Sequence, residues 1–292
     1  MITEVVLSAW TAPSSDTEKE KQERAERMIR QAIDDHEPFK DCSLKVYAKG
    51  SYANNTNVRS DSDVDIAVEC TEALYWDESE KGNHQTSGNL YQGIWTPAKL
   101  RAELILAMKK KFPDQVDISG VTAIQINANS ARVNADVVPC FSYRYYMKNN
   151  YRDGTKIFKT DGRSVANYPL QQIQNGRDKN NRTNYNYKKC VRILKRIENE
   201  MANKGSCKEL PSYFIECLAY NCPDYIFTFD TWTKTLREIL IFIYHTLEGE
   251  EPNEERWVEV NGCFYLFHSQ QKWTRQDGRA FAHAAWNYCE FK

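Results

Sequence analysis

The sequence predicts an α+β protein with two lobes, a mixed α/β lobe over residues 1–165 and a helical lobe over residues 166–292. Its 292 residues are about twice the length of a common single domain, which favours two lobes. Up to about residue 160, segments with the two-residue alternation of strands lie between segments with helical periodicity. After about residue 180, apolar residues recur mainly with the 3.6-residue period of helices.

Local signals mark the expected elements. Ser15–Glu18 is a capping box that begins a long helix ending near Asp35, and Thr96-Pro97 begins a second helix ending near Lys111. Residues 73–95 carry neither period and are expected to be irregular. Alternation predicts strands over residues 43–49, 64–70, 121–127 and 131–140. Helical periods predict helices over residues 183–204, 211–220, 231–248 and 278–291, and residues 257–267 are expected to be strand or loop.

Composition excludes several classes of protein. The 39 Lys and Arg residues balance 40 Asp and Glu residues, so the chain is not a general polyanion binder. The nine cysteines form no CxxC pair, which argues against a zinc site and favours reduced thiols in the cytoplasm. The N-terminus lacks the basic start of a signal peptide, and the apolar stretch Ile239–Tyr244 is far shorter than the about 20 residues of a membrane span. We therefore expect a cytoplasmic protein without zinc or a membrane segment.

Three aspartates are the strongest candidates for catalysis. Asp63 and Asp65 flank Val64 at the start of an expected strand, where residues i and i+2 point to the same face, about 6.6 Å apart. Asp136 lies in the expected strand over residues 131–140, and it completes a triad if the two strands are neighbours. Such carboxylates can hold two divalent ions, and oxygen ligands suit Mg²⁺ or Mn²⁺ rather than zinc. The alternative is a strand end with solvated acids.

A Gly-Ser pair, Gly50-Ser51, ends the preceding strand, and eleven residues separate Ser51 from Asp63. Backbone N–H groups at such a strand end can bind a phosphate, and a following helix would add the positive end of its dipole. The alternative is an ordinary turn. The order of strand, Gly-Ser, connector, paired acids and third acid is much rarer than any of its parts, and it favours a phosphate site beside a metal site.

In the helical lobe, Lys188, Arg192 and Lys195 recur at positions i, i+4 and i+7 and form one basic stripe. An acidic lobe that faced this stripe would make a triphosphate–metal site from two complementary halves. The alternative is a solvated charged face of the helix.

These features resemble a known family. The segment Gly50–Asp65 is similar to the signature of the polymerase-β-like nucleotidyltransferases, and within them to the branch of oligoadenylate synthases, cyclic GMP-AMP synthase and bacterial CD-NTases. Thr56, Arg59 and Ser62 are especially close to the oligoadenylate synthase form. Val191–Lys195 resembles the helix whose lysine holds the nucleotide triphosphate.

The next helix extends the resemblance. Pro211–Leu218 resembles the family helix whose opening Ser-Tyr contacts phosphate and stacks on a base, which here would be Ser212 and Tyr213. From the residues alone, Ser212 could instead cap a helix and Tyr213 could belong to the core. The matched features extend from about residue 40 to residue 220, in the order of the family.

The resemblance implies a polymerase-β-like nucleotidyltransferase lobe with a mixed sheet, followed by a helical lobe, with the active site in the cleft between them. It implies Asp63, Asp65 and Asp136 as catalytic residues and ligands of two Mg²⁺ ions, with Mn²⁺ as a substitute. The candidate nucleotide-binding residues are Gly50, Ser51, Lys188, Arg192, Lys195, Ser212 and Tyr213.

The implied reaction joins ribonucleoside triphosphates into a cyclic di- or oligonucleotide and releases pyrophosphate. The product would be a second messenger of anti-phage signalling of the CBASS type, sensed by a separate effector. Two departures favour a bacterial CD-NTase over the animal sensors. The Cys/His insertion with which cyclic GMP-AMP synthase binds DNA has no counterpart, and the strong basic surface that double-stranded RNA needs is missing at a net charge of −1. We therefore expect no obligatory DNA or RNA activator.

Three alternatives remain open. The enzyme could add nucleotides to an RNA end or to a protein, or the chain could bind nucleotides without catalysis. A kinase or hydrolase on another fold is weakened because the chain has no GxxxxGK[ST], GxGxxG or GxSxG motif. Base choice would depend on the expected loops over residues 73–95 and 173–186.

Overall fold

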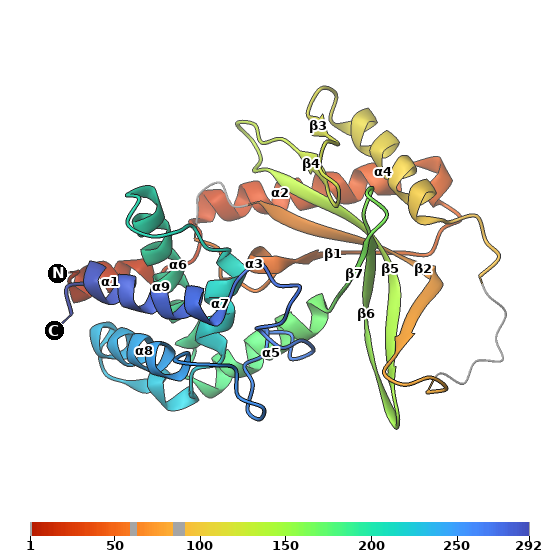
Figure 1. Cartoon of the computed structure of the whole chain (residues 1–292). Helices are drawn as coiled ribbons and strands as arrows, with labels where there is room; N and C mark the ends of the chain where they lie inside the picture. The colour runs from red at the N-terminus through yellow and green to blue at the C-terminus, as the bar shows by residue number, and fades with distance from the viewer. Residues whose placement is uncertain (1, 59–62, 84–90, 292) are drawn as a thin grey trace. The chain divides into compact units, whose positions relative to one another are not determined.

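A computed structural model describes residues 2–58, 63–83 and 91–291 of the chain (Figure 1). The chain forms two compact units. The sheet unit consists of Asp16–Ala53 and Arg59–Leu170, and the helical unit consists of Met1–Ser15, Asn54–Val58 and Gln171–Lys292. The sequence predicted two consecutive lobes that meet at residue 165. In the structure the division falls at residue 170, and two earlier segments also belong to the helical unit.

The sheet unit is built on a mixed sheet. Its strands follow the order β1-β2-β5-β4-β3, and β6 and β7 continue the sheet from the far part of β5. β2 and β5 are parallel, whereas the other neighbouring strands are antiparallel. The strands are β1 Leu44–Lys49, β2 Val64–Glu78, β3 Val116–Asp117, β4 Ile124–Ile126, β5 Ala135–Met147, β6 Asn150–Phe158 and β7 Ser164–Asn167.

Two helices cover one face of this sheet. α2 (Asp16–Asp34) and α4 (Pro97–Lys111) lie on the same side of the strands (Figure 1). Their apolar stripes pack against alternate residues of β2, beginning with Val64 and Ile66. Because strand side chains alternate between faces, the residues between them, including Asp65, point to the opposite face. The acids therefore lie on the face that these helices do not cover.

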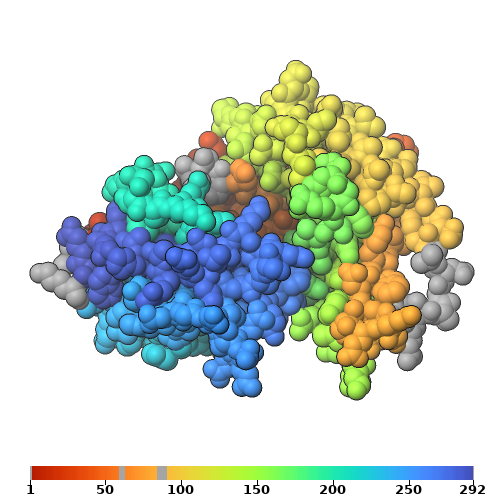
Figure 2. Space-filling view, viewed as in Figure 1, coloured from red at the N-terminus to blue at the C-terminus, as the bar shows by residue number. Residues whose placement is uncertain are grey.

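The strands are longer than predicted. β2 continues to Glu78, so residues 73–78, which were expected to be irregular, form part of a strand. A register shift between Cys70 and Leu74 allows β2 to stay paired with β5, which also extends beyond its predicted end to Met147. The ends of β2, β5 and β6 project together at the surface of the sheet unit (Figure 2).

In the helical unit, four predicted helices form, and two others, α1 (Glu4–Trp10) and α5 (Pro169–Arg182), were missed. α6 (Tyr187–Asn203), α7 (Ser212–Tyr220), α8 (Trp232–Thr246) and α9 (Arg275–Tyr288) match the predicted helices. α5 (Pro169–Arg182) occupies most of the loop expected over residues 173–186, because its many Gln and Asn residues hide the helical period. The remaining elements are α1 Glu4–Trp10, α3 Gly50–Ala53, η1 Glu37–Phe39 and η2 Asp224–Thr228. None of the helices in the described residues is long and apolar enough to cross a membrane.

Candidate active site

Two of the three predicted acids lie on adjacent strands. Asp65 of β2 is paired with Asp136 of β5 in the parallel register. Asp63 comes directly before β2, where the backbone N–H of Val64 donates to the carbonyl of Asn134 at 3.0 Å. The strands are therefore neighbours, which is the condition that the predicted triad required.

The electrostatics of Asp136 show that these carboxylates influence one another. Burial, followed by the charges of Asp65 and Asp63, raises the pKa of Asp136 from 3.8 to about 6. Lys49 and Gln125 oppose this shift. Lys49 Nζ lies 3.4 Å from Asp65 Oδ1, and Gln125 Nε2 donates to Asp136 Oδ1 at 3.5 Å. Lys49 thus offsets part of the repulsion between these carboxylates, and a cluster of like charges of this kind favours a bound cation.

The acids fit a metal that is shared with a substrate better than a closed protein cage. Within residues 2–58, 63–83 and 91–291, no three His, Cys, Asp or Glu side chains are arranged to hold an ion by themselves. Mg²⁺ usually binds through one or two carboxylates together with substrate phosphates. Asp65 and Asp136, with Asp63 beside them, supply such carboxylates.

Gly50 brings the Gly-Ser pair against the same acids. It has a φ of +68° and begins the one-turn helix α3 at the end of β1. A Cβ atom at Gly50 would lie 2.4 Å from Asp65 Oδ2, far closer than two such atoms approach. Only glycine therefore permits this close approach. The predicted turn at Gly50-Ser51 is a helical turn beside the carboxylates.

Gly50→Ala should reduce turnover by at least about 10-fold, because the new methyl group must displace the Asp65 carboxylate and small displacements of catalytic groups are costly. The measurement is the steady-state rate of pyrophosphate release by the purified chain. Gly162→Ala is the matched control. Gly162 also has a positive φ, +85°, but nothing lies within 4 Å of its Cβ position. It should keep its activity, and equal losses in both variants would contradict the packing argument.

In the helical unit, two residues of the predicted basic stripe are buried. Lys195 is 2% exposed, and its Nζ lies 2.9 Å from Glu216 Oε2 and 3.2 Å from Thr56 Oγ1. Arg192 is 5% exposed and donates to the carbonyls of Thr11 and Asn55. The alternative of a solvated face does not hold for these two side chains, because both are buried against partners in the same unit, and their predicted role in nucleotide binding stays a prediction.

Lys188 and Ser212 are the residues that remain open to a phosphate. Lys188 is half-buried, and no hydrogen bond or ion pair joins its ammonium group to the described residues. Burial lowers its pKa, and the charges of Arg177 and Arg192 contribute to the decrease. Ser212 is exposed at the first position of α7, where Pro211 rather than Ser212 is the N-cap. A bound phosphate would favour the charged form of Lys188.

Tyr213 agrees with the alternative prediction, in which it is a residue of the hydrophobic core. It is half-buried, packs against the hydrophobic core of the helical unit, and donates from its hydroxyl group to Glu259 Oε2 at 3.2 Å. Arg59 and Ser62, which belong to the resemblance, and residues 84–90 of the expected 73–95 loop lie outside the described residues.

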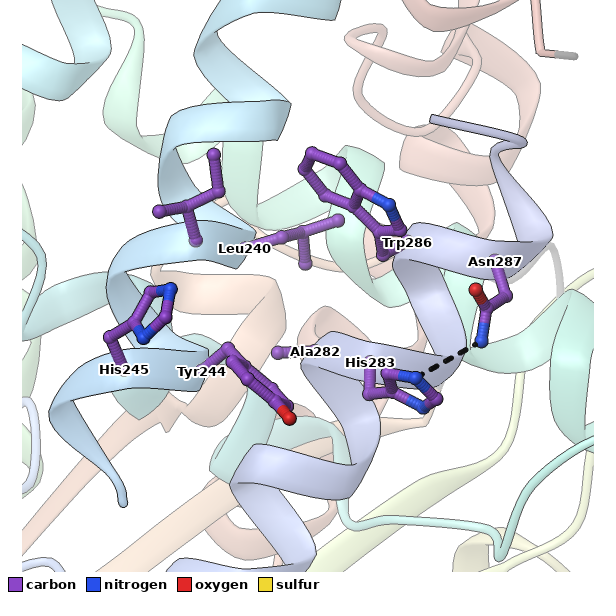
Figure 3. Close-up of a pocket in the computed structure, with 8 residues that line it drawn as sticks. Leu240, Tyr244, His245, Ala282, His283, Trp286 and Asn287 are labelled. Atoms are coloured by element: carbon purple, nitrogen blue, oxygen red, sulfur yellow. Dashed lines mark hydrogen bonds between the residues drawn. The ribbon is translucent and has the colours of Figure 1, made fainter. Parts of the chain in front are cut away.

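A cavity of about 350 Å³ lies elsewhere in the helical unit. α8 and α9 line it, and Figure 3 shows Tyr244 of α8 beside His283 of α9. It contains none of the predicted site residues and no carboxylate. We therefore place the candidate chemistry at the acids of the sheet unit and not in this cavity.

Sequence reasoning missed Lys49 and Glu216. Lys49 could have been found from strand alternation, because it ends the strand before the Gly-Ser pair and charged residues at strand ends often face a site. Glu216 stands alone in the apolar run Phe214–Ala219. A glutamate in such a run is rarely buried without a partner, so it signalled a buried ion pair.

Comparison with known proteins matches this arrangement. The family model for the cGAS/DncV-like nucleotidyltransferase C-terminal helical domain matches residues 174–290 of this chain. The cyclic dipyrimidine nucleotide synthase CdnE of Cecembia lonarensis is 36% identical, over 99% of both chains.

Two solved structures share the fold over the whole chain. The CdnE cyclic dinucleotide synthase of Elizabethkingia meningoseptica, solved with GTP and Apcpp, is 32% identical, has a TM-score of 0.83 and is covered over 100% of both chains. The CdnE c-UMP-AMP synthase of Rhodothermus marinus, solved with Apcpp and Upnpp, is 25% identical and has a TM-score of 0.84, over 100% of this chain and 98% of that one. The predicted α+β, polymerase-β-like nucleotidyltransferase fold is confirmed. The chain thus belongs to the CD-NTases, the cGAS/DncV-like nucleotidyltransferases, and is an enzyme of their cyclic nucleotide synthase branch.

Proposed function

We propose that this chain joins two ribonucleoside triphosphates into a cyclic dinucleotide, with Asp63, Asp65 and Asp136 as the ligands of two Mg²⁺ ions. The observation that carries the proposal is the pairing of Asp65 with Asp136 on adjacent strands, with Asp63 one residue before β2. The bound ions would neutralise phosphate charge and lower the pKa of the attacking ribose hydroxyl.

Gly50, Ser51, Lys188 and Ser212 would bind the nucleotide phosphates. Gly50 supports this role because it lies against Asp65, and Ser51 follows it in the chain. Ser212 and Lys188 support it because their polar groups are open to a ligand. For Arg192, Lys195 and Tyr213, the role in nucleotide binding stays a prediction, since each already has a partner in the helical unit.

The proposed reaction has two nucleotidyl transfers. In each, a ribose hydroxyl attacks an α-phosphorus atom, an ester bond forms, and the bond to the β-phosphate oxygen breaks with release of pyrophosphate. The hydroxyl proton passes to a carboxylate of the triad or to water. The first transfer yields a linear dinucleotide that keeps one triphosphate, and the second closes the ring. Most of the rate enhancement comes from positioning and charge neutralisation.

The bases differ among the relatives. The Cecembia enzyme is named for pyrimidines, the Elizabethkingia enzyme was solved with GTP and Apcpp, and the Rhodothermus enzyme is a c-UMP-AMP synthase. Dinucleotide formation is therefore the shared feature, and we extend to this chain the dinucleotide product but no particular pair of bases. A separate effector would sense the product.

The test is to incubate the full chain with ATP, GTP, CTP and UTP, singly and in pairs, without nucleic acid. The expected result is a phosphatase-resistant product whose mass is that of a cyclic dinucleotide, with two pyrophosphates released per product. Chelation with EDTA should abolish it, and Mg²⁺ and Mn²⁺ should be compared for its restoration. Products that form only when RNA or a protein acceptor is added would overturn the proposal in favour of a macromolecule-modifying nucleotidyltransferase.

A further inference from the structure

Glu216 is a buried carboxylate for which the proposed reaction provides no role. It is 1% exposed. Asn54 Nδ2 donates to its Oε1 at 2.5 Å, and Thr56 Oγ1 and Lys195 Nζ donate to its Oε2 at 2.7 and 2.9 Å. Burial alone would raise its pKa, but the charge of Lys195 and these hydrogen bonds outweigh burial and hold the pKa below its ordinary value. Glu216 is therefore an ionised group with every contact directed at Lys195 or at the segment Asn54–Val58.

That segment, which we call the connector, is held at several points within the helical unit. Arg192 donates to the carbonyl of Asn55 at 2.6 Å, and Asn55 has a φ of +54°. Asn57 Nδ2 donates to Ser14 Oγ at 2.5 Å. Asn54 and Thr56 are fully buried, which is unusual for polar residues.

A glycine in α5 makes room for the connector. A Cβ atom at Gly176 would lie 2.7 Å from the side-chain amide of Asn54. The amide therefore fits between the backbone of α5 and the carboxylate of Glu216. Since polar groups buried this deeply must be hydrogen-bonded to be tolerated, the position of the connector depends on Glu216.

The connector lies in the chain between the two parts of the proposed site. Two residues separate Asn54 from Ser51, and four residues separate Val58 from Asp63. Each residue spans at most about 3.6 Å, so an anchored connector restricts where the Gly-Ser pair and the first metal-binding acid can lie. An unanchored connector would free both at once.

We propose that Glu216 is a positioning residue, which with its counter-ion Lys195 fixes the connector and through it Ser51 and Asp63. The inference rests on the proposed function. The inference also gives the two buried residues of the basic stripe a role. Arg192 binds the connector at Asn55, and Lys195 binds Glu216. The alternative is an ion pair that only stabilises the helical unit.

The test compares Glu216→Gln with Asp224→Asn. Asp224 pairs with Lys179, which is 4% exposed, and it does not touch the connector. Both variants leave a buried lysine without its charged partner, but Asp224 is 37% exposed and Glu216 is 1% exposed, so Glu216→Gln should lose more stability. Measured well below both melting temperatures, Glu216→Gln should lower kcat by about 10- to 100-fold and raise the half-saturating Mg²⁺ concentration, with KM for nucleotide changed less than about 3-fold. Asp224→Asn should match the wild type in all three.

Hydrogen exchange tests the anchoring independently of turnover. Peptides that cover residues 52–58 should exchange faster in Glu216→Gln than in Asp224→Asn. Thr56→Val, which removes one donor at constant shape, should change exchange and kcat in the same direction by a smaller factor, and Thr56→Ser should restore both. Unchanged exchange, or equal kcat in Glu216→Gln and Asp224→Asn, overturns the inference. A wild-type chain that makes no cyclic product instead refutes the proposed function, and the exchange result still decides whether Glu216 anchors the connector.

Discussion

Asp65→Asn should reduce cyclic dinucleotide formation by at least about 1,000-fold, which corresponds to about 4 kcal/mol of activation free energy. Asn has nearly the same size as Asp and should leave β2 intact, but it lacks the negative charge that the proposed ions require. The measurement is the rate of pyrophosphate release at saturating nucleotide and Mg²⁺.

Asp77→Asn is the control for this experiment. Asp77 lies on the same strand, accepts a hydrogen bond from Tyr143, and forms an ion pair with Lys156 at 2.6 Å. Asp77→Asn makes the same chemical change and also breaks an ion pair. Asp77, however, lies near the end of β2, whereas Asp65 lies near its start. Its activity should stay within about 3-fold of the wild type. If Asp65→Asn retained more than about a tenth of the wild-type rate, the acids would not be metal ligands.

The strands that carry the acids could be predicted from sequence, but their pairing could not. Alternation placed Asp65 at the start of one strand and Asp136 in another, and both strands formed. The parallel register that sets Asp65 beside Asp136 depends on contacts between segments about 70 residues apart, which a local period does not contain. The resemblance to a family supplied that step.

The basic stripe shows a second limit of sequence reasoning. Helical periodicity correctly placed Lys188, Arg192 and Lys195 along α6, but it does not say what faces them. The partners of Arg192 and Lys195 come from distant segments, including the carbonyl of Asn55 and the carboxylate of Glu216. A charged side chain is predicted to be exposed unless such partners are known, because burial of an unpaired charge is costly.

Asp136→Asn should abolish activity and yet make the metal-free protein more stable at pH 7.5. In the folded chain, burial and the charges of Asp65 and Asp63 raise the pKa of Asp136 to about 6, whereas in the unfolded chain it returns to about 3.8. The folded state therefore binds the proton more tightly, so the stability penalty of Asp136 is complete above about pH 6, decreases as the pH falls from about 6, and is lost only below about 3.8. After allowance for screening by water at a half-buried group, the gain from Asn is about 1 kcal/mol, or a melting temperature higher by about 2–4 °C.

The measurement is thermal unfolding in EDTA at pH 7.5 and pH 5. The difference between Asp136→Asn and wild type should be largest at pH 7.5 and fall to about half at pH 5, because the carboxyl of the folded chain is then largely protonated whereas that of the unfolded chain, with a pKa of 3.8, is still ionised. Lys49→Met is the control of opposite sign, because Lys49 is the cation that lowers the pKa of Asp136, so its loss should decrease stability at pH 7.5. A variant that lost activity without gaining stability would show that the three carboxylates do not repel one another in the folded chain. We expect Asp136→Asn to gain stability because a site that binds cations holds several negative charges close together. Without the metal, the repulsion between these charges destabilises the fold.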